Sequence, residues 1–240
     1  MTNVVLDDWP PSQTTYKQLF LSSNGSLTES PESTEQSTLY QADTPSNQRG
    51  DDDESTEARF TYTFAKRALL LGYPSAQLFM STADHDDMDV FVQLRKADAT
   101  GKILTSLNAT PEEFGFDDES AVPNLSILRY PGPTGIVRAS RRQLDPRASK
   151  PNRPVLSMAG ATGEPVTPGQ VAQLDIAIWP TGIIFEAGEK LVFKVAGHPM
   201  NFVDFESLQG GYENANKGRH EIHFGGKKAA SSVSIPLVEL

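Results

Sequence analysis

The chain has 240 residues, carries a formal net charge of −10 and contains no cysteine. This acidic balance argues against nucleic acid as a partner, because binding it requires a basic face that displaces counterions. An anionic membrane surface would repel the chain as well. Without cysteine there is no disulfide framework, cysteine nucleophile or thiolate metal site. Hydrophobic residues make up 38% of the chain, which is enough for one core in a single domain over residues 1–240.

Neither a membrane span nor a targeting segment is visible in the sequence. No apolar run approaches the roughly 18 residues that cross a bilayer. The opening residues "MTNVVLDDWPPSQ" lack the basic and apolar regions of a signal peptide. We therefore expect a soluble, cytoplasmic protein.

The first predicted element is a strand at residues 15–23, "TYKQLFLSS", which ends at a turn-forming Asn-Gly pair. Residues 23–58 then form a polar segment rich in Ser, Thr, Glu, Asp and Pro. Such a segment buries too little apolar surface to offset its chain entropy, so we interpret it as a flexible insertion within the domain. The short run "TLYQA" inside it is expected to dock as an edge strand.

Alternating apolar and polar residues predict most of the later elements. "RFTYTF" at 59–64 alternates with period 2. Residues 87–108 predict a hairpin, because "ILTSL" follows a Gly-containing turn. Further strands are predicted at 75–83, 172–180, 190–198, 219–224 and 231–240, about eight to ten in all. Many short strands with Gly/Pro-rich turns indicate an all-β sandwich of jelly-roll type rather than a parallel α/β sheet.

Only residues 110–120, "TPEEFGFDDES", have a helical pattern. Thr110 can cap the amino end, Pro111 suits the first helical position, and Glu113 completes a capping box. We predict a short helix that decorates a loop.

The sequence lacks the common catalytic and cofactor motifs. It contains no G-x-S-x-G nucleophile elbow, no P-loop and no G-x-G-x-x-G, so no cofactor is expected. The acidic run "ADHDDMD" at 83–89 fails as an EF-hand loop, because Met88 would occupy the fifth position. We interpret it as a solvated strand entry with no metal, with a weak calcium site as the alternative.

Three histidines are candidates for general acid–base chemistry. His198, His220 and His223 lie near the carboxyl end, and Asp204 is a carboxylate that could tune them. Residues three apart on a strand point to opposite faces, so His220 and His223 make a poor metal chelate. Structural roles are the competing interpretation.

The segment "GIVRASRRQLDP" at 135–146 is unusually basic for a strand. After Ile136 and Val137 start the strand, it presents the three guanidiniums of Arg138, Arg141 and Arg142. Arginine can fork onto carboxylates, and the chain has 31 acidic residues. An intramolecular network or an interface clamp is predicted, with anion binding as the alternative.

A resemblance to a known family rests on three segments in order: "GIVRASRRQLDP", "PVTPGQVAQLDIAIWPTGIIFEAGEKLVFKVAGH" and "NKGRHEIHFGGKKAASSVSIPLVEL". Together they resemble the C-terminal domain of the X-Pro dipeptidyl-peptidase and cocaine-esterase (CocE/NonD) family of serine hydrolases. The upstream "DWPPSQTTYKQLFL" and "DDMDVFVQLRKADATGK" resemble its opening strands, so the resemblance extends from Asp8 to Leu240. One departure is Glu189, where the family commonly shows a histidine or another polar residue.

The resemblance implies a galactose-binding-like jelly roll that packs against an α/β-hydrolase domain and helps to wall its cleft. The family's Ser, Asp and His triad lies in that hydrolase domain, so the resemblance carries no triad residue onto this chain. It also implies that the three arginines are scaffold or interface residues.

Three functions remain open from the sequence. The first is a stand-alone module that binds a small apolar or sugar-like ligand in a sandwich cleft. Its candidate lining residues are aromatic, although core packing explains most aromatics on strands: Trp179, Phe202, Phe205 and Tyr212. The second is a non-hydrolytic enzyme, such as a cyclase, isomerase or dehydratase, that uses the same pocket. The third is a trans-acting subunit of a separate hydrolase; a homodimer is an alternative way to cover its docking surface.

Overall fold

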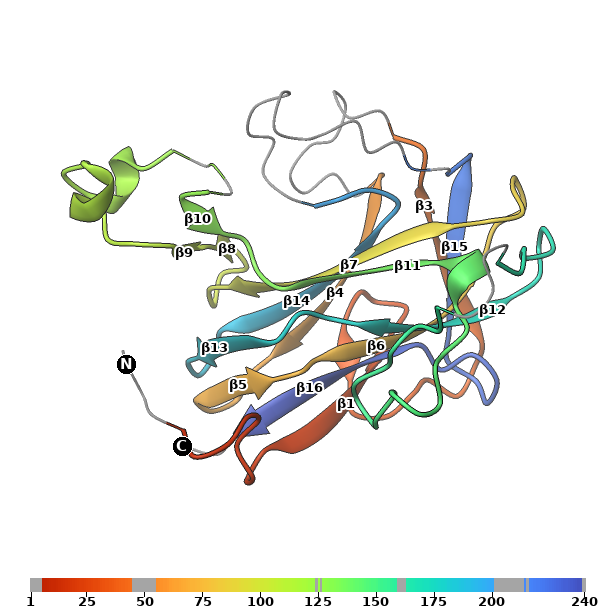
Figure 1. The fold of residues 1–240 in the computed structure, drawn as a ribbon, viewed down its shortest axis with the longest axis horizontal. Coiled ribbons are helices and arrows are strands. Elements are labelled where there is room, and N and C mark those ends of the chain that lie inside the picture. The colour runs from red at the N-terminus through yellow and green to blue at the C-terminus, as the bar shows by residue number, and fades with distance from the viewer. Residues whose placement is uncertain are drawn as a thin grey trace.

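The computed structural model describes residues 6–44, 55–123, 125, 127–158, 163–200, 214 and 216–238. Two antiparallel sheets enclose one large hydrophobic core (Figure 1). The predicted all-β sandwich is therefore confirmed. No helix in these ranges is long and apolar enough to cross a membrane.

The larger sheet has nine strands in the order β13-β5-β16-β6-β15-β3, with β1 paired to β16, β2 to β1 and β12 to β6. Their bounds are β1 Thr15–Leu21, β2 Leu27–Thr28, β3 Gln36–Gln41, β5 Ala68–Gly72, β6 Ser75–Ser81, β12 Ala172–Ala177, β13 Thr181–Phe185, β15 Arg219–Phe224 and β16 Ser232–Val238.

The smaller sheet has five strands in the order β11-β7-β14-β4, with β8 paired to β7. Their bounds are β4 Glu57–Thr63, β7 Asp89–Ala97, β8 Ile103–Leu104, β11 Thr134–Arg138 and β14 Lys190–Ala196. A separate two-stranded ribbon consists of β9 (Ser106–Leu107) and β10 (Arg129–Tyr130).

Both edges of the smaller sheet are joined to segments of the larger one. At the β11 edge, the Trp179 amide donates to the Thr134 carbonyl at 3.0 Å. At the β4 edge, the Thr61 amide donates to the Gly25 carbonyl at 2.9 Å, beside β2. The two sheets are thus tied together along two sides as well as through their core.

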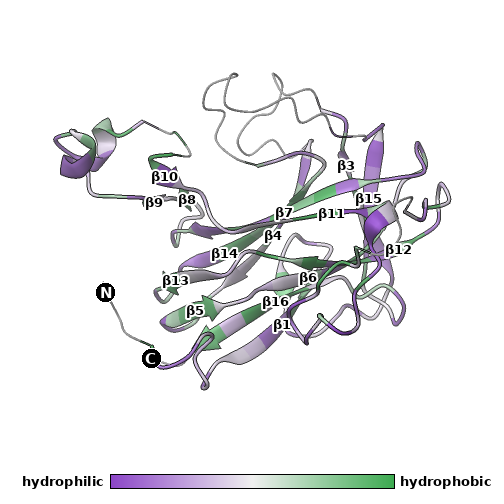
Figure 2. Cartoon of the chain, in the orientation of Figure 1, coloured by the Kyte–Doolittle hydropathy of each residue, from purple (hydrophilic) through white to green (hydrophobic). Residues whose placement is uncertain are grey.

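Every strand predicted from the sequence is present, and within the described residues four others were missed: the two-residue strands β2 and β10, and the longer β5 and β13. Strand β5 is the continuous apolar run "ALLLG", and β13 is "TGIIF"; neither alternates in the way that the other strands do. Figure 2 shows hydrophobic residues concentrated on β5, β7 and β14, and polar residues on β15. Strands β7 and β14 are buried along almost their whole length, so they form the middle of the smaller sheet.

The polar segment at 23–58 contributes β2, β3 and the start of β4 within its described part. Strand β3 pairs with β15 at the end of the larger sheet, which confirms the predicted edge strand. It docks because Tyr40 and Ala42 are buried in the core. Residues 45–54 of this segment lie outside the described residues.

The predicted helix at 110–120 is wrong in type. Two short 3₁₀ helices replace it, η2 (Glu112–Phe114) and η3 (Glu119–Ala121); a third, η4 (Ala139–Arg141), follows β11. The capping box does form, because the Thr110 amide donates to Glu113 Oε2 at 2.9 Å. The turn ends at Gly115, whose φ of 79° is left-handed, before a full α-helical turn is completed.

We expect Gly135→Ala to destabilise the fold by about 2 kcal/mol, because it would overpack the junction of the two sheets. A Cβ at Gly135 would lie 2.4 Å from the Ala177 carbonyl oxygen, so backbone must move. The control is Gly182→Ala, whose Cβ would meet only the side-chain end of Leu71 at 3.2 Å. Urea unfolding of both variants tests this, and equal stabilities would contradict it.

Candidate functional site

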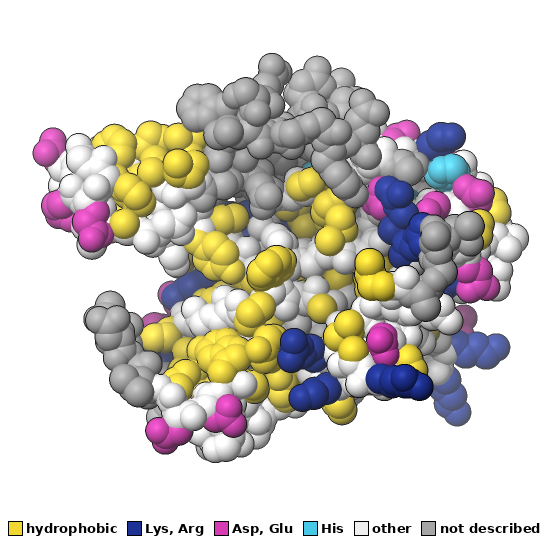
Figure 3. Space-filling model, in the orientation of Figure 1, with side chains coloured by type: hydrophobic (Ala, Val, Ile, Leu, Met, Phe, Trp, Pro, Cys, Tyr) yellow, Lys and Arg dark blue, Asp and Glu magenta, His cyan; other side chains and the backbone are white. Residues whose placement is uncertain are grey.

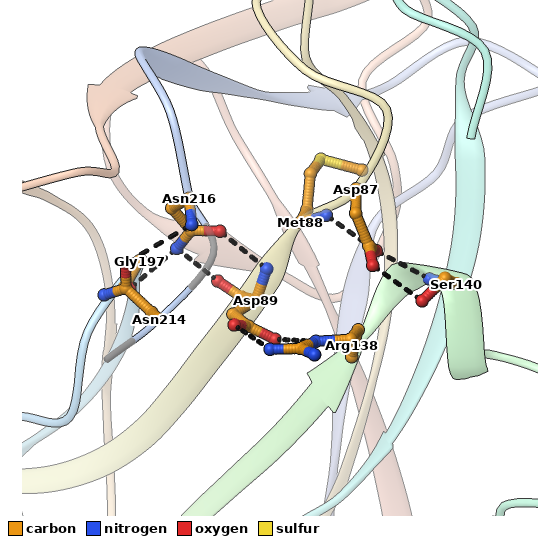
Figure 4. Close-up of polar contacts among 8 residues, drawn as sticks. All are labelled: Asp87, Met88, Asp89, Arg138, Ser140, Gly197, Asn214 and Asn216. Carbon is orange, nitrogen blue, oxygen red and sulfur yellow. Dashed lines mark hydrogen bonds and ion pairs between the residues drawn. The ribbon is translucent and has the colours of Figure 1, made fainter. Parts of the chain in front are cut away.

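The first residue of β7 is held by a polar network that joins several segments (Figure 4). The Asp89 side chain is 1% exposed, and both its oxygens accept hydrogen bonds of 2.7 Å from Arg138 on β11. Asn216 accepts from the Asp89 amide at 2.7 Å and donates to the Asp89 carbonyl at 2.9 Å. This network fixes β7, β11 and the approach to β15 together.

Its neighbours make similar structural contacts. Asp87 Oδ1 accepts from the Ser140 amide at 2.8 Å, and Asp87 Oδ2 accepts from the Ser140 hydroxyl at 2.6 Å. The Asn214 and Asn216 side-chain amides both donate to the Gly197 carbonyl. The acidic run at 83–89 was interpreted from the sequence as a solvated turn before a strand. In the structure, Asp87 and Asp89 also hold the ends of neighbouring strands in place.

The arginines of the basic segment pair within the chain. Besides Arg138, Arg142 donates to the carbonyls of Ala139 and Glu164 at 2.9 and 2.8 Å. Arg141 lies against Gly163, where a Cβ would be 3.2 Å from its Nε. These contacts fit a scaffold role. In the ranges that the structure describes, no group of three or more His, Cys, Asp or Glu could hold a metal ion.

His220 is part of the core. Its Nδ1 lies 3.0 Å from the Tyr40 hydroxyl, and its side chain is fully buried. Burial lowers the pKa of His220 to about 4, against the charges of Asp89, Asp43 and Asp87, which raise it. This enclosed, uncharged environment fits a structural role for His220.

His223 faces the other side of β15, as its spacing from His220 predicts. Its Nε2 lies 2.8 Å from Ser81 Oγ and 3.8 Å from Glu221 Oε2. A Ser-His-acid triad needs the carboxylate on the other ring nitrogen, where it orients the imidazole. Serine and carboxylate share one nitrogen here, so the described contacts do not assemble a triad.

The remaining candidates are separate or outside the described residues. His198 is buried at the end of β14, and its Nδ1 lies 3.1 Å from the Pro199 carbonyl oxygen. The structure thus gives the three histidines different partners. Four candidates lie outside the described residues: Phe202, Asp204, Phe205 and Tyr212.

An exposed apolar patch lies beside the junction of β11 and β12. We define it by Trp179, Ile136 and Tyr130, which are 71%, 48% and 38% exposed. Trp179 bonds through its amide to β11, and the Tyr130 side chain bonds to Thr181 at the start of β13. Hydrophobic side chains gather over the middle of the face in Figure 3. Sequence reasoning singled out Trp179 but missed Tyr130 and the exposure of Ile136.

These features define a class: an all-β sandwich domain whose described histidines and serines form no hydrolytic triad. Residues 1–233 match the family model described as the X-Pro dipeptidyl-peptidase C-terminal non-catalytic domain. The chain belongs to this family. A search of curated proteins found no match.

Solved structures agree with this assignment. A CocE/NonD family hydrolase from Staphylococcus aureus is 27% identical, with a TM-score of 0.77 over 98% of this chain and 38% of its own. An aminopeptidase from a marine sediment Thaumarchaeota archaeon is 16% identical, with a TM-score of 0.62 over 98% of this chain and 38% of its own. An α-amino acid ester hydrolase is 16% identical, with a TM-score of 0.56 over 93% of this chain and 36% of its own. The latter two show the fold alone, and this chain spans less than two fifths of each structure's length.

Proposed function

We propose that this chain is the non-catalytic sandwich of a CocE/NonD-type serine hydrolase and docks on an α/β catalytic domain through the apolar patch. The observation that carries the proposal is Trp179, which is 71% exposed beside exposed Ile136 and Tyr130. Exposed apolar patches of this kind usually mark an interaction surface. Family membership supplies the occupant, because the relatives of known structure are hydrolases of which this fold forms about two fifths.

The basic segment supports the same proposal. Arg138 and Arg142 are paired within the chain, so β11 is a rigid strand that presents Ile136 outward. In this arrangement the arginines position the docking surface and do not take part in chemistry. The sandwich would shape a cleft whose catalytic groups belong to the hydrolase domain.

The non-hydrolytic enzyme receives less support. It needs a histidine that exchanges protons near pH 7, whereas His220 is buried and its pKa is lowered to about 4. His223 is the more accessible histidine, with 23% of its side chain exposed. That alternative therefore depends on His223, and the ligand-binding alternative is developed below.

We expect tagged protein, purified from its source cells, to bring down a chain that contains an α/β-hydrolase domain, identified by mass spectrometry. Trp179→Ser should weaken the complex by about thirtyfold and reduce its recovery accordingly, since an aromatic anchor at an interface contributes on the order of 2 kcal/mol. Leu39→Ser is the matched control, because Leu39 is 49% exposed on edge strand β3, away from the patch.

Two results would contradict this proposal. One is that the recovered partners contain no α/β-hydrolase domain. The other is that Trp179→Ser and Leu39→Ser reduce recovery of the partner equally. A homodimer is the competing way to cover the patch. Light scattering after size exclusion would then show a dimer that Trp179→Ser converts to a monomer.

A further inference from the structure

We propose that a groove on the outer face of the larger sheet binds a neutral, polyhydroxylated ligand of the size of a mono- or disaccharide. This site is independent of the apolar patch and goes beyond the docking function. Residues with hydrogen-bonding or aromatic side chains line it, chiefly Tyr16, Gln18, Gln77, Asn152, Asp175 and Lys150. In Figure 1 the loop at 143–157 passes in front of β6, β16 and β1.

The floor of the groove is a continuous row of polar side chains. Strand register places Gln18 of β1 opposite Ser234 of β16, and Ser232 of β16 opposite Gln77 of β6. Gln77 in turn lies opposite Asp175 of β12 and donates to its Oδ1 at 2.9 Å. Four adjacent strands thus direct amide, hydroxyl and carboxylate groups to one surface.

The loop that covers this floor is held in place from within and from below. The Asp145 amide donates to the Val155 carbonyl at 2.8 Å. The Ser234 hydroxyl donates to Asn152 Oδ1 at 2.8 Å, which ties the loop to the sheet. The Arg153 guanidinium lies 5.0 Å from the centre of the Tyr73 ring. The groove is therefore formed before any ligand enters, which lowers the entropic cost of binding.

The chemistry of the lining selects the ligand class. The groove has a volume of about 410 Å³, within the usual range for small-molecule sites. The amides and hydroxyls of the groove keep donors and acceptors beyond their contacts with one another. An apolar ligand would remove water from these groups without replacing its hydrogen bonds, which is costly. Among the described residues that line the groove, the charged side chains are one carboxylate, Asp175, and one ammonium, Lys150, so neither an anion nor a cation is favoured. Tyr16 adds an aromatic ring, 37% exposed, against which the C–H face of a sugar can pack.

Of the two ligand classes kept open by the sequence, the groove favours the sugar-like one over the apolar one. It also differs from the site expected from Trp179 and the aromatic residues near the carboxyl end. None of its main lining residues was a candidate, because a polar side chain on a strand resembles an ordinary solvated position.

The test is a ¹H–¹⁵N NMR titration of the full chain with D-glucose, D-galactose, N-acetyl-D-glucosamine and cellobiose, each to about 50 mM. We expect saturable shift changes at groove amides with at least one of these sugars, and none there with 1-hexanol. Gln18→Ala should weaken the best sugar by about fivefold and Asp175→Asn by about tenfold, as the loss of a neutral and a charge-assisted hydrogen bond predicts. The control is Gln36→Ala, an exposed glutamine on β3 of the same sheet, which should leave affinity unchanged.

Several results would overturn the proposal. One is that none of the four sugars changes the chemical shifts of groove amides, or that the changes are confined to another surface. Another is that 1-hexanol changes the groove shifts more than the sugars do. The last is that Gln36→Ala lowers sugar affinity as much as Gln18→Ala or Asp175→Asn. Each is independent of hydrolase docking, because the titration uses the isolated chain and the docking variant Trp179→Ser leaves the groove unaltered.

Discussion

Replacement of Arg138 by methionine is expected to lower the free energy of unfolding by about 3 kcal/mol, because it removes the charge partner of a buried carboxylate. The Asp89 side chain is 1% exposed and receives two 2.7 Å hydrogen bonds from this guanidinium. Arg138 itself is 41% exposed, which places the expected cost at the lower end for such pairs. Urea unfolding at pH 7 measures the loss.

The matched control is Arg142→Met. Arg142 pairs with Glu164, whose side chain is 84% exposed, so this pair should contribute less than about 1 kcal/mol. The double variant Asp89→Leu with Arg138→Met should recover part of the stability, because it removes the buried charge together with its partner. If Arg138→Met were no more costly than Arg142→Met, the structural importance of the Asp89 network would be refuted.

Titration of His220 should make the free energy of unfolding about 3 kcal/mol larger at pH 6.5 than at pH 4. The reason is that burial lowers the pKa of His220 from 6.5 to about 4 in the folded chain. As the pH falls below 6.5, the unfolded chain takes up a proton at this histidine before the folded chain does. Its contribution is therefore fully present above pH 6.5 and is lost as the pH falls to about 4. Denaturant unfolding at several pH values measures this slope.

His220→Gln should flatten the slope over this interval, because glutamine does not titrate. His223→Gln is the control; His223 lies on the opposite face of the same strand, so the slope should remain. Carboxylates such as Asp43 and Asp98 have pKa values below their usual range, and their contributions are lost at lower pH in all three proteins. A wild-type slope retained in His220→Gln would show that His220 is not the source.

The sequence predicted the sandwich because most of its strands alternate visibly. "RFTYTF" and "AQLDIA" bury one face, and such a pattern is legible without coordinates. Strand β5 was missed because "ALLLG" is apolar throughout. Such a run has no period that would distinguish a buried strand from a buried helix, so only its length and the residues beside it can do so. The capping box at Thr110 and Glu113 was predicted correctly, but the short turn ends in 3₁₀ geometry at Gly115.

The sites were less predictable than the fold, because they depend on register. Asp89 and Arg138 are opposite each other only through the pairing of β7 and β11, which the sequence does not specify. The groove combines residues from Tyr16 to Ser234, and no local motif connects them. The face of each histidine on β15 was predictable, since it follows from strand periodicity alone.

The two junctions between the sheets also bear on self-association. An uncovered edge strand offers unpaired amides and carbonyls to which strands of other molecules can add. Strands β11 and β4 are the two outer strands of the smaller sheet, and each lies beside a segment of the larger one, at Thr134 and at Thr61. Both edges of the smaller sheet are therefore hydrogen-bonded within the molecule at these points, which leaves fewer unpaired groups there for a strand of another molecule.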